Sequence, residues 1–488
     1  MMKGSHLFQM AAMQLAMLLT IMVSSGGAAG QREIKLTLSE AVETALLNNL
    51  GLHLKQQDVL EAEGTVQIAA GSFAPLLSAE AGAAGQKTTA VSPTTAEEER
   101  TTNWQVGIRR RFTPGTEIDL SLSNNTLDTD ADLLLFDPVY RTGITIGITQ
   151  PLLKDRGSEA QLAESKAAQS LLAARTFLVD DEAADLAARV KTAYWDLVLA
   201  YQNLDVLALS LKLAETLRDE TASRIEAGTL ADIDIFQPES EVAVREQELI
   251  SGQQAIGGAE DHLKLLINSN NWLTPLRPID LPVTKPIAYD PVQILEKALA
   301  DRPDLKAAAL QVQSTKWQLK KAENELLPAL DLFGSAGFGG TADSYGRAID
   351  SSLDADDHQW QVGLRFSHPL DNTLAEGRYR QVNARHTKNQ STLEMIKQEV
   401  RRQARATIRD LDLSLKTIEA ANKTTLARQK SLEAEQAKFD AGRATTFDVL
   451  VAQQAYSRAL SAENEAKVTY AQAVAALDRL LGVVTVDR

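Results

Sequence analysis

The residues that most often carry out chemistry in proteins are sparse and scattered in this chain. Cysteine is absent, and the histidines beyond the first thirty residues lie far apart along the sequence. None of them forms the i, i+4 pair that would place two metal ligands on one helix face. The sequence therefore predicts no zinc site, no cofactor and no enzyme. The histidines in question are His53, His262, His358, His368 and His386.

Two further patterns have ordinary structural explanations. The glycine-rich segment from Gly334 to Gly340 precedes no predicted helix, so we expect a flexible strand end or loop there and not a phosphate-binding loop. Asp180, Asp181 and Glu182 lie in a charged helical stretch, where a solvated face is expected. The formal net charge of −15 argues against a nucleic-acid partner.

The same ordered set of segments occurs twice in the chain. Asn49-Leu50-Gly51-Leu52 with Pro75 corresponds to Arg302-Pro303-Asp304-Leu305 with Pro328, at a shift of 328 − 75 = 253 residues. Further on, Ala227-Gly228 with Asp234 corresponds to Ala441-Gly442 with Asp448, at a shift of 442 − 228 = 214 residues. A period this long indicates a duplicated, domain-sized unit and not a solenoid.

Composition divides the chain into four parts. Lys3, the apolar run from Leu7 to Val23 and the small residues after it are typical of a secretory signal peptide. Five prolines between Leu273 and Pro291 predict an extended connector. The predicted parts are a signal peptide at 1–29, a first repeat at 30–272, the connector at 273–291 and a second repeat at 292–488.

Each repeat is predicted to begin with short helices and to end with a long helical hairpin. Thr37 or Ser39 can cap the first helix. From Ser158 to Ala227 the chain lacks proline and glycine, which predicts about 105 Å of helix at 1.5 Å per residue. Apolar residues at steps of three and four form a seam there. The hairpins are expected at about 155–269, turning at Gly228, and at about 374–482, turning at Gly442; the first seam is Leu186, Val190, Ala193, Leu197, Tyr201, Leu204, Ala208 and Leu211.

Between the short helices and the hairpins, apolar and polar residues alternate with a period of two. This predicts strands at about 77–151 and 330–370, with loops at Thr88 to Thr102 and Asp128 to Asp137. One face could pack on a soluble core or face lipid. Beyond the predicted signal no run approaches 18 consecutive apolar residues, which favours a transmembrane β-barrel. Trp104 and Trp360 are then expected at strand starts in an aromatic girdle, and Arg110 at a membrane rim.

This order of segments closely resembles the TolC family of outer-membrane efflux proteins. The resemblance covers nearly the whole mature chain. Its most specific part is the turn Phe439-Asp440-Ala441-Gly442 followed by Phe447-Asp448-Val449-Leu450; Leu38-Ser39-Glu40-Ala41-Val42 and Leu327-Pro328-Ala329-Leu330 also belong to it. The resemblance implies a mainly α fold with a transmembrane β-barrel portion, in which a homotrimer shares one barrel in outer-membrane lipid and extends a helical tunnel across the periplasm.

The resemblance also implies a function and partners. The chain would be the passive exit duct of a tripartite efflux or type I secretion system, working with a periplasmic adaptor (membrane fusion) protein and an inner-membrane transporter. The helix turns at Gly228 and Gly442 would contact the adaptor and close the pore. There Asp448 matches a gate aspartate, Val451 replaces a second one, Phe439 replaces a tyrosine that links to an aspartate matched by Asp234, and Ala444 replaces an arginine.

Three points stay open at the level of sequence. The first repeat has room for an extra pair of strands, which either enlarge the barrel or form an external flap. A rival interpretation is a secreted periplasmic coiled-coil scaffold or adaptor protein with a soluble β domain. The transported substrate and the class of pump do not follow from these residues, because a duct lined with polar side chains is permissive. Val451 is equally well explained as a helix-surface residue without a gating role.

Overall fold

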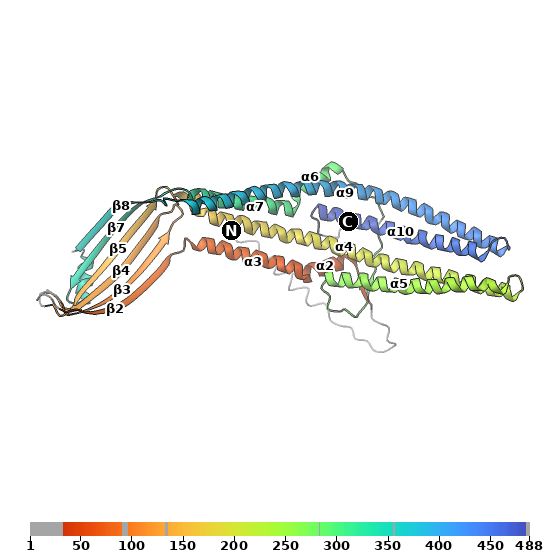
Figure 1. The fold of residues 1–488 in the computed structure, drawn as a ribbon, viewed down its shortest axis with the longest axis horizontal. Helices are drawn as coiled ribbons and strands as arrows, with labels where there is room; N and C mark the ends of the chain where they lie inside the picture. Colours follow the sequence, from red (N-terminus) through yellow and green to blue (C-terminus); the bar gives the residue numbers. More distant parts are fainter. Residues whose placement is uncertain (1–32, 90–95, 132–134, 283, 355–356, 485–488) are drawn as a thin grey trace.

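The protein is elongated, with a β-sheet at one end and two helix turns at the other (Figure 1). The structure is a computed structural model that describes residues 33–89, 96–131, 135–282, 284–354 and 357–484. The predicted signal peptide at 1–29 lies outside the described residues. Long helices connect the two ends of the molecule, so whatever happens at the turns is far from the sheet.

Four α-helices of the first repeat, α2, α3, α4 and α5, correspond in order to α6, α7, α9 and α10 of the second. The long helix α4 (Gly157–Glu226) has 70 residues and α9 (Thr373–Asp440) has 68. In Figure 1, α3 lies beside the sheet-side half of α4 and α5 beside its other half, and α7 and α10 lie along α9 in the same way. The remaining bounds are α2 (Leu38–Asn48), α3 (Leu50–Gly71), η2 (Asp232–Ile235), α5 (Phe236–Leu266), α6 (Pro291–Asp301), α7 (Pro303–Glu325) and α10 (Thr446–Leu480).

Local sequence determines where these helices begin. Thr37 and Glu40 form a capping box at the start of α2: the Thr37 Oγ1 accepts from the Glu40 N–H at 3.2 Å, and Glu40 Oε2 accepts from the Thr37 N–H at 2.9 Å. In α6, Asp290 caps the helix by accepting from the Val292 N–H at 2.9 Å. Both helices therefore start at capped positions, as side-chain chemistry predicts.

Asn49 and Arg302 occupy corresponding positions in the two repeats. Asn49 lies at the junction of α2 and α3, and Arg302 lies at the junction of α6 and α7. Asn49 Oδ1 accepts from the Leu52 N–H at 3.2 Å, and its Nδ2 donates to the Leu266 carbonyl at 2.9 Å. Arg302 donates twice to Asp304, at 3.0 and 2.7 Å, and once to Gln403 Oε1 at 2.7 Å. Each residue thus ties its junction to a neighbouring helix, by different chemistry at the same place.

Six antiparallel strands form one sheet in the order β2-β3-β4-β5-β7-β8. The short helix α8 (Tyr345–Leu353) packs on β5 and β7, where Thr142 Oγ1 donates to the Ala348 carbonyl at 2.7 Å. A Cβ on Gly340 would collide with that carbonyl, so the position requires glycine. The strand bounds are β2 (Leu76–Lys87), β3 (Glu98–Arg111), β4 (Glu117–Thr129), β5 (Val139–Pro151), β7 (Ala329–Ala342) and β8 (Asp357–Ser367).

The structure corrects several local predictions in the strand region. Residues 98–102, predicted as loop, belong to β3, because Lys87 and Glu98 continue the β2–β3 pairing and form an ion pair at 2.7 Å. Strand β4 extends to Thr129, into the predicted acidic loop. The segment from Gly334 to Gly340 lies inside β7 and is not a loop. Trp104 lies in the middle of β3 instead of starting it, whereas Trp360 lies near the start of β8.

The predicted seam of α4 holds for its first half only. Leu186, Val190, Ala193 and Leu197 are buried, but Ala208 is exposed. Further along, the buried positions shift to Val206, Ser210, Ala214, Leu217 and Thr221. The reason is that α4 packs against different partners along its length, with α3 and α7 near the sheet and α5 and α10 near the turns.

The extended connector is tied to the start of the chain. Strand β6 (Leu276–Pro278) pairs in parallel with β1 (Ile34–Leu36), and Tyr194 Oη of α4 donates to the Leu36 carbonyl at 3.0 Å. By length and composition, α4 contains a window apolar enough to cross a membrane. This helix packs against α2, α3, α5, α7 and α10, although only 28% of the window is buried.

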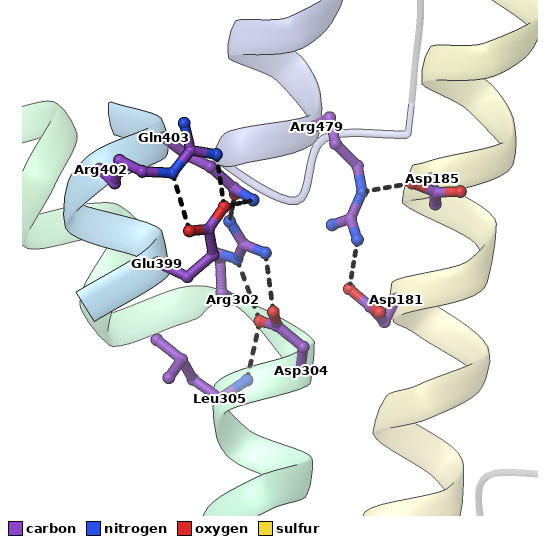
Figure 2. Close-up of polar contacts among 9 residues, drawn as sticks. All are labelled: Asp181, Asp185, Arg302, Asp304, Leu305, Glu399, Arg402, Gln403 and Arg479. Carbon is purple, nitrogen blue, oxygen red and sulfur yellow. Dashed lines mark hydrogen bonds and ion pairs between the residues drawn. The ribbon is translucent and has the colours of Figure 1, made fainter. Parts of the chain in front are cut away.

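Charged side chains join the two repeats near the middle of the molecule (Figure 2). Arg479 of α10 lies 2.8 Å from Asp181 and 3.1 Å from Asp185, both of α4. A second pair between these helices, Lys191 with Asp478 at 2.8 Å, is more deeply buried. The expectation of a solvated face is therefore wrong for Asp181, which is four-fifths buried and paired.

Burial raises the pKa of Asp181 above its ordinary value of 3.8, although Arg479 opposes that shift. The folded chain therefore holds this proton more tightly than the unfolded chain does. The contribution of Asp181 to stability then falls as the pH rises from 3.8 through the raised folded value. Nearby on α9, hydrogen bonds from Arg402 lower the pKa of Glu399 to about 2 (Figure 2).

We expect Arg479→Gln to reduce the free energy of unfolding by about 1–3 kcal/mol at neutral pH, because Asp181 loses its cation while remaining largely buried. The deficit should shrink in acid, where Asp181 is protonated. Denaturation midpoints at several pH values measure both effects. Lys416→Gln, which removes an exposed ion pair with Asp412, is the matched control and should leave the denaturation midpoint nearly unchanged. Equal effects of the two variants would contradict a stabilising role for this junction.

Candidate functional site

The two helix turns at the far end have the same backbone geometry. Gly228 has φ +74° and Gly442 has φ +69°, a region that favours glycine. The N–H of each glycine donates to a carbonyl three residues back, and the next N–H donates five residues back, at 2.8–2.9 Å. These are Schellman motifs, which end a helix and satisfy its last carbonyl groups. A turn of the chain at both glycines is what their sequence pattern predicts.

Asp448 lies in the first turn of α10, where it forms a capping box with Thr445. The Asp448 carboxylate accepts from the Thr445 hydroxyl at 2.7 Å and from the Thr445 N–H at 2.9 Å. In return, the Thr445 Oγ1 accepts from the Asp448 N–H at 3.3 Å. The bonds that the carboxylate accepts lower the pKa of Asp448 below its ordinary value. The side chain is exposed, so the turn presents a fixed negative charge at neutral pH.

Asp234 occupies the corresponding place in the first repeat, at the shift of 448 − 234 = 214 residues. Its Oδ2 accepts from the Ala231 N–H at 3.1 Å. Ala231 stands where the second repeat has Thr445, and alanine has no side-chain oxygen to cap the helix. The first hairpin accordingly resumes through the 3-10 helix η2, whereas the second resumes directly as α10.

Phe439 is buried inside the turn region, with 2% of its surface exposed. It packs in a small cluster with Leu217 and Val449, and Ala444 is partly buried against the same cluster. The Arg224 guanidinium lies 4.1 Å from the Phe439 ring centroid and donates to the Phe439 carbonyl at 2.7 Å. Phe439 therefore contributes packing and a carbonyl acceptor inside one chain.

Arg224 is the residue of this region that sequence reasoning missed. Besides Phe439, it pairs with Asp440 at 3.1 Å, so the end of α4 is tied to the end of α9. An arginine at a helix C-terminus is common, because it favours the negative end of the helix dipole. Nothing in the local sequence indicates that it reaches the other repeat. We call this contact the Arg224 link.

Large apolar side chains are exposed around the two turns. Ile233 is 71% exposed and Phe447 is 57% exposed. Val451, predicted at a second gate position, is 49% exposed, and Phe236 is also exposed. A surface with several such residues beside fixed carboxylates is suited to contacts with other chains.

The residues predicted for the membrane interface lie on one face of the sheet. Arg110 pairs with Ile118 at the helix-side end of β3, on the face of Ile108, and its guanidinium lies 5.0 Å from the Phe112 ring. Trp104 contacts Tyr345 of α8, with ring centroids 6.2 Å apart. Trp360 is 77% exposed on β8. Within the described residues no group of three or more histidine, aspartate or glutamate side chains could hold a metal ion.

The two turns allow a reciprocal test of helix capping. We expect Thr445→Ala to destabilise the start of α10 by about 1 kcal/mol and to raise the pKa of Asp448 toward its ordinary value. Ala231→Thr should supply the missing cap in the first repeat and slow exchange there. Hydrogen exchange of the amides at 446–450 and 232–236 measures both effects. Faster exchange at the first turn in Ala231→Thr would contradict the correspondence of the two turns.

Sequence comparisons find similarity to outer-membrane efflux and secretion proteins. The family described as "Outer membrane efflux protein" matches residues 294–483. Outer membrane protein TolC of Escherichia coli K12 is 25% identical over 268 residues, which is 53% of each chain. The alkaline protease secretion protein AprF of Pseudomonas aeruginosa is 23% identical over 325 residues, or 65% of each chain. The chain spans about half the length of the TolC relatives that it matches.

Solved structures share the fold along most of the chain. The Campylobacter jejuni CmeC outer membrane channel has a TM-score of 0.70 at 15% identity, covering 96% of this chain and 94% of that one. The outer-membrane channel OprN has a TM-score of 0.69 at 19% identity, covering 91% and 89%. TolC is described as an outer membrane protein, and OprN and CmeC are described as outer-membrane channels, in agreement with the predicted localisation. Residues 294–483 thus resemble the outer membrane efflux protein family, and the whole fold resembles that of solved outer-membrane channels.

Proposed function

We propose that three copies of this chain form a passive exit duct from the periplasm through the outer membrane. The proposal rests mainly on the shape of the molecule, in which an elongated helical body separates two chemically different ends. An apolar-faced sheet lies at one end, two hairpin turns lie at the other, and α4 alone is about 105 Å long. A body with a lipid-compatible end and a distant aqueous end is suited to bridge a compartment.

The sheet supports assembly with copies of the same chain. Its outer strands β2 and β8 have no strand beside them on their outer sides within the described residues. Open edges are not tolerated in lipid, because each unpaired backbone group costs several kcal/mol there. A single six-stranded sheet cannot close on itself with the interior that a duct needs, so neighbouring copies must supply the missing pairing. The repeat units 30–272 and 292–488 would then alternate around the duct.

The helix turns would form the periplasmic aperture. Asp448 carries a fixed charge there, and three copies would make a ring of three carboxylates. Val451 stands one helical turn away and offers an apolar side chain in place of a second charge. The exposed Ile233 and Phe447 beside Gly228 and Gly442 would contact a periplasmic adaptor protein, which in turn couples an inner-membrane transporter. The related AprF is named for alkaline protease secretion and the related MdtP for multidrug resistance, so both secretion and efflux are represented among the relatives.

The Arg224 link would hold this aperture in its closed shape. It joins the ends of α4 and α9 inside one chain, where the position of Ala444 offers no charge for a tie to a neighbour. Opening requires the two hairpins of a chain to move relative to each other, so this contact lies on the moving boundary. Arg224 would therefore be a gate residue in addition to Asp448, Val451, Asp234 and Phe439.

A periplasmic scaffold with a soluble β domain is the less favourable alternative. On β8 the side chains of Val362, Leu364 and Phe366 are each about two-thirds exposed, and Trp360 is more so. A soluble domain would leave this row of apolar side chains in water, whereas a membrane covers it.

The proposal is tested by conduction in planar lipid bilayers. Trimers of the full chain should conduct ions, and Asp448→Ala should lower cation selectivity, because the carboxylate ring is lost. Glu43→Ala, which removes the same charge from exposed α2, should leave selectivity unchanged. Val451→Asp should raise cation selectivity by adding a second ring. Trimers that fail to conduct, or a fully soluble protein that does not enter bilayers, would overturn the exit-duct function.

A separate variant tests the Arg224 link. Arg224→Leu should loosen the turn by about 1 kcal/mol, since charge-assisted hydrogen bonds to Phe439 and Asp440 are lost from a partly exposed site. We expect faster hydrogen exchange at 436–443 and a larger single-channel conductance. Arg218→Leu is the control, because Arg218 forms its ion pair with its neighbour Asp219 on the same helix and not with α9 within the described residues. Unchanged conductance in Arg224→Leu would exclude Arg224 from the gate.

A further inference from the structure

The first repeat contributes four strands to the sheet and the second repeat contributes two. Strand β2 follows α3 and β5 precedes α4, just as β7 follows α7 and β8 precedes α9. The corresponding pairs are therefore β2 with β7 and β5 with β8. The β3–β4 hairpin (Glu98–Thr129) is additional, and it lies between β2 and β5. In a four-stranded sheet of this design β2 and β5 would be direct neighbours.

We propose that the β3–β4 hairpin is part of the transmembrane wall, so that three copies enclose a barrel of 18 strands with a widened outer pore. This inference rests on the proposed function, because it requires the trimeric duct. It specifies what distinguishes this duct: a pore wide enough for bulky hydrophilic cargo, lined by charged side chains of the inserted hairpin.

The first support is unbroken pairing. Strand β3 pairs with β2 from Leu76–Arg109 to Lys87–Glu98, and β4 pairs with β5 from Glu117–Thr149 to Leu127–Val139. The strands have 11 to 14 residues, enough for a tilted transmembrane strand of about 9–11. A flap would leave the sheet and release these pairings. Here the inserted strands are integrated on both sides.

The second support is a continuous apolar face. Val106, Leu122, Ile144 and Phe338 are successive cross-strand partners on β3, β4, β5 and β7. These side chains share one face of the sheet, because residues of the same parity point the same way. The apolar band of the second repeat therefore continues across the inserted hairpin without a change of register. A strand that faced water on both sides would not need this alignment.

The third support is on the opposite, polar face. Asp119 of β4 lies over Gly147 of β5, where an added Cβ would come within 2.5 Å of the Asp119 carboxylate. Strand β5 therefore has a glycine beside the position where β4, in the additional hairpin, has a larger side chain. On the same face Glu117 pairs with Arg111 at 3.1 Å and Arg109 at 3.4 Å. Charged side chains on this face would line the lumen near the helix-side end of the strands.

Strand number determines barrel width. Three six-stranded sheets give 18 strands. With a strand spacing of about 4.8 Å and a tilt of about 40°, such a barrel is about 36 Å across, against about 24 Å for 12 strands. The insertion thus increases the diameter of the barrel by about half. Barrels of about 16–18 strands have an open aqueous interior. The lumen-facing Arg109, Arg111 and Asp119 would favour hydrated, charged cargo.

Single-cysteine labelling tests the position of the hairpin, because the natural chain contains no cysteine. The test pair is Leu120→Cys and Ser121→Cys on β4, and the control pair is Val362→Cys and Gln361→Cys on β8. Full-length trimers in lipid vesicles are treated with a membrane-impermeant charged maleimide. We expect Ser121→Cys and Gln361→Cys to react, and Leu120→Cys and Val362→Cys to react slower by about tenfold or more, because the reactive thiolate does not form in hydrocarbon.

The two pairs separate the failure of this inference from failure of the proposed function. If the control pair alternates and both β4 positions react equally, the hairpin is a water-exposed flap and the 18-stranded wall is wrong. If the control pair does not alternate either, the sheet does not lie in the membrane and the exit duct falls with it. Alternation in both pairs supports the wall. After denaturation the same maleimide should label all four positions, which shows that each thiol is intact, and recovery of each variant as a trimer before labelling shows that it is folded.

Discussion

The unpaired edges of the six-stranded sheet are the constraint on which the rest of this structure depends. In lipid each backbone N–H and C=O must be paired, and within the described residues only the four inner strands have a neighbouring strand on both sides. The sheet can therefore exist in a membrane only as part of a closed ring of copies. Closing that ring places the long helices of each copy side by side around an axis. In the proposed assembly, the duct and the aperture at the turns follow from this requirement.

The duplication explains how one chain meets that requirement economically, and the two repeats differ where the molecule does its work. Helices correspond in order and nearly in length, and both hairpins reverse at a glycine with positive φ. At the junction between the first two helices of each repeat, Asn49 bonds to a neighbouring helix through its side-chain amide. Arg302 bonds to a neighbouring helix through its guanidinium. Backbone geometry is thus kept while side-chain chemistry varies, because the proposed tube would need helices of equal length and matching turns but not identical contacts.

Sequence could predict the features that local chemistry determines. The cap at Thr37, the reversals at Gly228 and Gly442 and the extent of α4 follow from propensity and spacing alone. The sequence did not predict the features that depend on contacts between segments far apart in the chain. Residues 98–102 are polar and read as loop, yet pairing with β2 makes them strand. Asp181 lies in a run of charges, and only its approach to Arg479, almost three hundred residues away, shows that it is paired. Arg224 was missed for the same reason.

The differences between the repeats fall at opposite ends of the molecule, and their physical consequences are independent. At the sheet end, the added hairpin changes the circumference of the wall without altering the register of its neighbours, because its apolar and polar faces match theirs. At the turn end, the contact between hairpins is made within one chain by Arg224, next to a capped Asp448. Some 105 Å of helix separates these places, so a wider outer pore does not require a wider aperture. In the proposed duct, the turns would therefore determine the closed state, and the added hairpin would determine the width of the outer pore, independently of each other.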